Sequence, residues 1–199
     1  IRDIRKIPMF PFKEEEIEKI NKGMDGIDKA LDAVKCKERH FCEGNHDNWL
    51  NSFSQTYPYL SQYTVKKTLK LDERGYTYHP FGKFLKIGKL YFYHGHQYGG
   101  QYHAANHLRK LGCNIMYGHW HDLQQHSATH MDGAKSAWSL GCLKDMSSEA
   151  NLWLDGRRVN WAHAFAIIDF YGKGLFTVNV VQIIEGKCSI RGQLIDGNK

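Results

Sequence analysis

Apolar side chains recur every three or four positions over residues 14–34, and this spacing predicts an amphipathic helix. The apolar positions of the stretch are Ile17, Ile20, Met24, Ile27, Leu31 and Val34. A shorter stretch from His103 to Leu111, with apolar Ala104, Ala105, Leu108 and Leu111, predicts a second helix that ends at Gly112. Because His103 and His107 lie four residues apart on that helix, we expect them to share a solvated helix face.

Three short runs that stop just before glycine or histidine predict strands, and we expect these strands to be buried. These runs are Arg39 to Glu43, Leu90 to Tyr93 and Asn114 to Tyr117.

From His163 onward the chain is rich in β-branched and aromatic residues. The residues Ala164 to Phe170 and Leu175 to Ile184 predict a hairpin joined by Gly172-Lys173-Gly174. Residues 185–187 indicate the turn of a second hairpin, between Ile183-Ile184 and Cys188 to Ile190. Helices and short strands followed by an antiparallel sheet predict an α/β fold with two sheets flanked by helices.

The bulk properties restrict the protein class. The 199 residues fit a single domain, residues 1–199, and no run approaches the roughly 18 apolar residues of a membrane span. Residues 1–12 do not show the pattern of a signal peptide. Five cysteines without any CxxC spacing argue against a disulfide framework and a cysteine-based zinc site, and favour a reducing, cytoplasmic location. The net charge of +6 favours anionic partners.

Twelve histidines are present, and several stand beside glycine in short blocks that directly follow a predicted strand. The blocks are Gly44-Asn45-His46-Asp47, His94-Gly95-His96 and Gly118-His119-Trp120-His121. Polar groups at the carboxyl ends of neighbouring strands converge on one crevice. Imidazoles together with a carboxamide oxygen suit a divalent transition ion such as Mn, Fe, Ni or Zn, whereas calcium prefers oxygen ligands throughout.

These three blocks, in this order, resemble the calcineurin-like metallophosphoesterase superfamily, and most of all its compact bacterial and phage members. The signature of that family is D-x-H, then G-D, G-N-H-[D/E], a histidine with glycine, and G-H-x-H. The resemblance implies a four-layer α/β/β/α sandwich. It also implies an enzyme that hydrolyses phosphate esters, as a phosphodiesterase or phosphatase, with metal-activated water at a dinuclear centre.

Carried over by motif, the resemblance implies that Asn45, His94 and His119 hold one metal ion and that His121 holds the other. The implied cofactors are two divalent transition-metal ions, manganese first, with iron, nickel or zinc as alternatives. The same resemblance implies that His46 contacts the phosphoryl oxygen and the leaving group, and that Asp47 orients His46.

The position of His96, two residues after His94, makes it a candidate for substrate contact. The expected substrate is a phosphate ester, with nucleotides and nucleic acids included, and no membrane is expected as a partner. The sequence leaves the oligomeric state open.

The chain departs from the family pattern before Asn45, because it contains no D-x-H block and no G-D block there. We therefore expect that the first strands and their metal ligands belong to an N-terminal stretch that this sequence lacks. Two alternatives to the phosphoesterase stay open. One is a DNA or RNA nuclease of the same superfamily, and the other is a catalytically impaired metal-binding scaffold.

Overall fold

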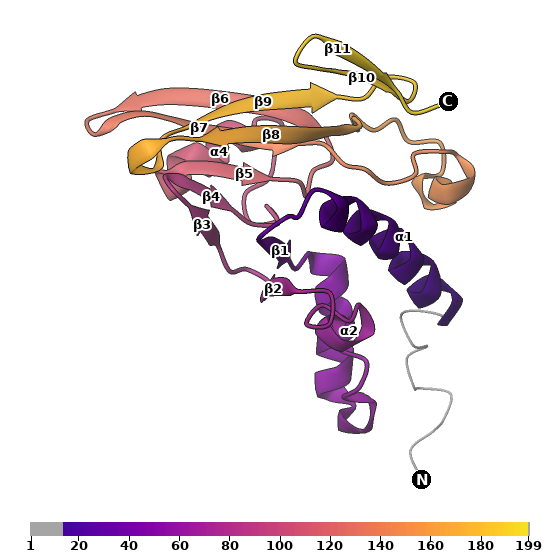
Figure 1. Ribbon diagram of the computed structural model, residues 1–199. Helices are drawn as coiled ribbons and strands as arrows, with labels where there is room; N and C mark the ends of the chain where they lie inside the picture. The colour runs from indigo at the N-terminus through magenta and orange to yellow at the C-terminus, as the bar shows by residue number, and fades with distance from the viewer. Residues whose placement is uncertain (1–13, 199) are drawn as a thin grey trace. The chain divides into compact units, whose positions relative to one another are not determined.

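The computed structural model describes residues 14–198 and shows a mixed α/β protein with open sheets, 31% helix and 32% strand (Figure 1). The chain divides into two compact units, Ile1–Lys83 and Phe84–Lys199. The expectation that residues 1–12 are no signal peptide lies outside the described residues. The assignment of residues 1–199 to a single domain stays a prediction.

The first unit contains a long helix, a pair of parallel strands and a helical segment between the strands. Its elements are α1 (Glu14–Ala33), β1 (Arg39–Cys42), α2 (Asn45–Thr56), η2 (Pro58–Leu60), α3 (Val65–Thr68) and β2 (Tyr76–His79). Strand β1 pairs with β2 from Arg39↔Tyr76 to Cys42↔His79. Apolar side chains of α2 and α3, among them Leu50 and Val65, form the core of this unit with Leu69 and Leu71. The predicted helix over residues 14–34 and the predicted strand at Arg39 are confirmed.

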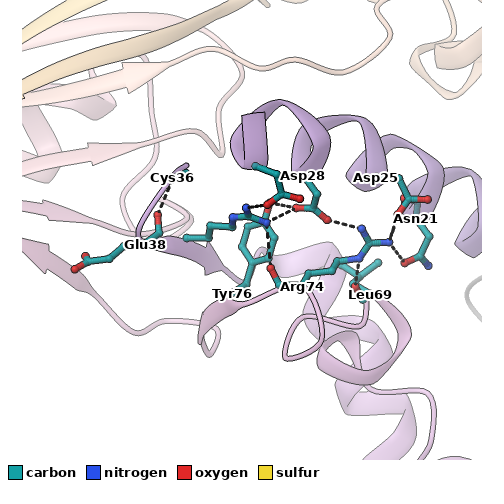
Figure 2. A network of polar contacts seen from close by, with 10 residues as sticks. Asn21, Asp25, Asp28, Cys36, Glu38, Leu69, Arg74 and Tyr76 are labelled. Atoms are coloured by element: carbon teal, nitrogen blue, oxygen red, sulfur yellow. Dashed lines mark hydrogen bonds and ion pairs between the residues drawn. The ribbon is translucent and has the colours of Figure 1, made fainter. Parts of the chain in front are cut away.

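A polar network attaches α1 to the segment that leads into β2 (Figure 2). The nearly buried Asp28 carboxylate contacts the guanidinium groups of Arg74 and Arg39 and accepts a hydrogen bond from the Tyr76 hydroxyl at 3.0 Å. Arg74 also pairs with Asp25 at 2.6 Å. Burial and the hydrogen bond to Asp28 raise the pKa of Tyr76. A carboxylate so far removed from water requires such partners.

The second unit is built on a five-stranded sheet of order β3-β4-β5-β7-β6. Its strands are β3 (Leu85–Ile87), β4 (Leu90–Phe92), β5 (Asn114–Tyr117), β6 (Leu123–His130) and β7 (Gly133–Leu140). The pairs β4-β5 and β5-β7 are parallel, whereas both outer pairs are antiparallel. Strands β4, β5 and β7 therefore begin at the same end of the sheet.

The two faces of this sheet are covered by different elements. Helix α4 (His103–Leu111) packs its Ala104 and Leu108 against one face, where Ile115 and Tyr117 point. The hairpin of β8 (Ala164–Phe170) and β9 (Phe176–Gln182) covers the other face. Alternation of side chains along each strand separates these two cores. The remaining elements are η3 (Glu149–Leu154), η4 (Gly172–Gly174), β10 (Lys187–Ile190) and β11 (Gln193–Asp196).

Most predicted elements of this unit are confirmed. The structure places α4 and β5 at the predicted bounds, and Gly112 ends α4 in the left-handed conformation with φ +61°. Strands β8 and β9 pair as the predicted hairpin. Ile184 bridges Lys187 across the predicted second turn, but Lys187–Ile190 forms its regular pairing with β11, which was not predicted.

The β6-β7 hairpin was not predicted either. Its strands carry polar runs such as Gln124 to Ser127 and lack the apolar alternation of a half-buried strand. Among the described residues no helix is long and apolar enough to cross a membrane.

Candidate functional site

The Gly44–Asp47 block of the first unit starts helix α2. Gly44 caps the helix in an extended conformation, and the Asp47 carboxylate accepts a hydrogen bond from the Gly44 N–H at 2.9 Å. Burial raises the pKa of Asp47, while the Gly44 N–H opposes that effect. The structure thus gives Asp47 a capping role, and its predicted orientation of His46 stays a prediction. His46 stacks on Trp49, with ring centroids 4.3 Å apart.

In the second unit, two of the predicted metal ligands meet. His94 follows β4 and His119 follows β5, and these strands are parallel neighbours in the sheet. The His94 carbonyl accepts hydrogen bonds from the Gly118 N–H at 3.2 Å and from the His119 N–H at 2.9 Å. The His94 Nε2 and His119 Nδ1 atoms then lie 2.8 Å apart. The carboxyl ends of two strands therefore bring two imidazole nitrogens to one point.

This pair has the ligand chemistry of a transition-metal site, and its nitrogen atoms lie somewhat closer together than two ligands of one ion. Two imidazole nitrogens that bind one ion, each at about 2.0–2.1 Å, lie roughly 3–3.4 Å apart. The observed separation of 2.8 Å is only slightly shorter and suits a hydrogen bond between the rings. Within the described residues no group of three or more His, Cys, Asp or Glu side chains is arranged to hold a metal ion. Asn45, the third implied ligand of this ion, belongs to the first unit.

The other two predicted histidines of the second unit have different surroundings. The His96 ring lies near this pair, with its centroid 6.2 Å from that of His94 and 6.5 Å from that of His119. Burial lowers the pKa of His96. His121 adopts a left-handed conformation with φ +61°, and its ring lies against Trp161 at 5.1 Å.

Glycine at position 95 permits the close approach of the two histidine segments. Gly95 has φ +101°, and a Cβ atom there would stand 2.4 Å from the ring of Tyr117. The Gly95 carbonyl accepts a hydrogen bond from Trp120 Nε1 at 3.2 Å. The residue between His94 and His96 therefore has to lack a side chain.

Behind the histidines lies a buried polar network that the sequence analysis missed. His103 Nε2 lies 2.9 Å and 3.0 Å from the two Asp122 carboxylate oxygens, and His103 Nδ1 lies 2.7 Å from the Tyr117 hydroxyl. Asp122 also accepts hydrogen bonds from Ser139 Oγ at 3.0 Å and from Gln124 Nε2 at 2.9 Å. Tyr117 and Asp122 flank the Gly118–His121 block, so the network fixes both ends of the segment that carries His119.

The expectation of a solvated face for His103 and His107 is wrong. The exposed fractions of these residues are 2% and 0%, and His107 Nδ1 donates a hydrogen bond to the His103 carbonyl at 2.7 Å. The spacing contained the signal, because both histidines fall on the same helix face as Ala104, Leu108 and Leu111. That apolar stripe faces the core, and the histidines point inward with it.

Comparison of the chain with protein-family models, with curated proteins and with solved structures found no match. The residues, their order along the chain and the geometry of each unit are therefore what indicates a function.

Proposed function

We propose that this chain is a metal-dependent phosphoester hydrolase in which His94 and His119 hold a divalent transition-metal ion. The observation that carries the proposal is the 2.8 Å separation of His94 Nε2 and His119 Nδ1 at the ends of β4 and β5. Neutral imidazole nitrogens are suitable ligands for Mn, Fe, Ni and Zn. The order of the three histidine-containing blocks supports the calcineurin-like assignment and, with Asn45 and His121 as further ligands, a centre of two ions.

We also propose the four-layer α/β/β/α arrangement for the whole domain. Its support comes from the second unit, where α4 covers one face of the five-stranded sheet and the β8-β9 hairpin covers the other. A cytoplasmic location is part of the proposal, and the five free thiols are consistent with it.

When bound, divalent ions would neutralise a phosphate ester and activate the attacking water. His46 would donate a hydrogen bond to a phosphoryl oxygen or to the leaving oxygen. Such a bond strengthens as negative charge develops on its acceptor. The stacking of His46 on Trp49 restricts the orientations of the imidazole, and the Asp47 cap fixes the backbone from which it projects.

The test combines metal content with hydrolysis. The purified chain is dialysed against Mn²⁺, Fe²⁺, Ni²⁺ or Zn²⁺, its bound metal is measured by elemental analysis, and hydrolysis of bis(p-nitrophenyl) phosphate and p-nitrophenyl phosphate is assayed. We expect His94→Ala to lose bound metal and activity together. His126→Ala, at an exposed position of β6, serves as the matched control and should lose neither.

A second variant separates metal binding from catalysis. We expect His46→Ala to keep its metal content and to lose hydrolysis, because the implied role of this imidazole is to contact substrate. Metal content in His94→Ala equal to that of the unsubstituted chain would overturn the metal assignment. Stoichiometric metal without hydrolysis of either ester would favour the scaffold alternative, and hydrolysis of DNA or RNA alone would favour the nuclease.

A further inference from the structure

A cavity of about 620 Å³ lies at the end of the five-stranded sheet where β4, β5 and β7 begin. The histidines of the candidate metal site follow the opposite ends of β4 and β5. Three chain reversals form the cavity walls: the β3-β4 turn, the β6-β7 turn and the segment that leads into β9. The cavity is therefore separate from the histidine site.

Hydrogen bonds connect these reversals to one another, so the walls of the cavity are already ordered without a ligand. Asn114, at the start of β5, donates to the Lys89 carbonyl at 3.3 Å and accepts from the Ser136 N–H at 2.9 Å. The Lys89 N–H donates to the Gly174 carbonyl at 2.9 Å. A Cβ atom on Gly88 would stand 2.8 Å from that same carbonyl, so the two turns are in direct backbone contact. A ligand would not have to order these walls on binding.

The charge around the cavity is positive. Lys86, Lys89 and Lys135 line it, and Asp132 is the one acidic residue among the lining side chains. Asp132 pairs with Lys135 at 2.7 Å, and the Lys135 side chain is only 20% exposed. The Lys86 ammonium lies over the Tyr91 ring at 5.0 Å. Three ammonium groups against one carboxylate leave an excess of two positive charges at this site.

One part of the lining is apolar. Trp138 of β7 and the side chains of Leu175, Phe176 and Val178 form this part of the wall. A simple anion would use the lysines and leave the half-exposed Leu175 side chain in contact with water. A ligand with an anionic group and an aromatic or apolar body would use both kinds of wall.

We propose that this cavity binds a small phosphorylated molecule with an aromatic or apolar body. The phosphate would lie among Lys86, Lys89 and Lys135, and the body would lie along Leu175 and the neighbouring apolar side chains. This inference uses none of the histidines and goes beyond the proposed hydrolase function.

The test uses ADP as the probe, with inorganic pyrophosphate as the probe that lacks a body. Both are titrated into the full chain by isothermal titration calorimetry in the presence of EDTA, which removes divalent ions from the histidine site. We expect ADP to bind with a Kd below about 1 mM. We expect the Kd of pyrophosphate to be at least about tenfold higher. Because the measurement excludes divalent ions, its outcome is independent of the proposed hydrolysis.

Substitutions at exposed positions test the lysine wall and the apolar wall separately, and we expect them to leave the fold intact. We expect the double variant Lys86→Gln, Lys89→Gln to weaken ADP binding about tenfold, since two ammonium contacts to the phosphates are lost. Leu175→Ser should weaken ADP but not pyrophosphate. Lys110→Gln removes the same kind of exposed charge from the end of α4 and should change neither affinity.

Several results would overturn the proposal. They are the absence of ADP binding at millimolar concentration, equal affinity for ADP and pyrophosphate, and equal losses in the lysine double variant and Lys110→Gln. Binding of a single-stranded oligonucleotide that weakens equally in every lysine variant, without saturable ADP binding, would instead indicate a diffuse nucleic-acid surface. It would also overturn the assignment of a small ligand.

Discussion

Substitution of Asp122 tests whether the network behind the histidines stabilises the second unit. The Asp122 side chain is 10% exposed and the His103 side chain 3% exposed, so the pair is almost entirely removed from water. In Asp122→Ala the His103 Nε2 atom would lose its acceptor inside the core. Breaking a buried pair by removing one partner costs about 3–5 kcal/mol, because the other group stays buried and unpaired.

A graded series separates the hydrogen bond from the charge. Asp122→Asn keeps one side-chain oxygen that can accept from His103, and we expect it to cost only about 1–2 kcal/mol. Asp132→Ala removes a carboxylate whose side chain is 69% exposed, and we expect no measurable change in stability.

The assay is urea unfolding of the full chain followed by tryptophan fluorescence. Four of the five tryptophans (Trp120, Trp138, Trp153 and Trp161) lie in the second unit, so the signal reports mainly on that unit. The free energy of unfolding is extrapolated to water, and an unchanged m-value shows that the unfolding transition is comparable. An Asp122→Ala protein as stable as the Asp132→Ala control would refute the reasoning.

Three further substitutions test other parts of the structure. Asp28→Ala should cost about 3–5 kcal/mol of unfolding free energy, whereas Asp25→Ala, with a side chain 67% exposed, should cost about 0–1 kcal/mol. Urea unfolding followed by far-UV circular dichroism, which detects the helices of the first unit, compares the two variants. Equal losses would contradict the network in Figure 2. Gly95→Ala should cost about 1–3 kcal/mol more unfolding free energy than Gly133→Ala. Both glycines have positive φ, but only a Cβ atom at position 95 would collide with a ring, that of Tyr117. Thermal unfolding compares the two variants. Burial lowers the pKa of His107 in the folded protein, so its contribution to stability is complete above the unfolded pKa of about 6.5 and is lost as pH falls below it. His107→Gln should therefore lose less stability than the unsubstituted chain between pH 7 and pH 5, and equal losses would show that other groups cause the acid sensitivity.

Local sequence patterns predicted the elements that local interactions determine. Helix α1 and the end of α4 at Gly112 depend on neighbours within a few residues, and both appear where they were predicted. The meeting of His94 and His119 also follows from a simple rule, because each follows one of two parallel strands. Residue order was enough to predict these features.

The elements that were missed depend on contacts between distant residues. Strands β6 and β7 carry polar side chains on a partly exposed face. The pairing of β7 with both β5 and β6 supplies the stability that apolar alternation does not. The pairing of His103 with Asp122 joins residues 19 positions apart. Nothing in the sequence near either residue identifies the other as its partner. The apolar stripe of α4 could have indicated that His103 is buried, although a solvated face was predicted. Only the structure identifies Asp122 as the group that satisfies its hydrogen bonding.

The segment from His119 to Asp122 shows how adjacent residues support the site and the core together. The His119 ring reaches His94, while the ring of Trp120 stacks on His103 at 5.2 Å and its Nε1 donates to the Gly95 carbonyl. The next residue, His121, takes a left-handed conformation, and Asp122 returns to the core to pair with His103. Because each side chain leaves the segment in a different direction, the backbone is fixed from several sides. The position of the His119 imidazole therefore depends on buried groups that would never contact a metal ion or a substrate.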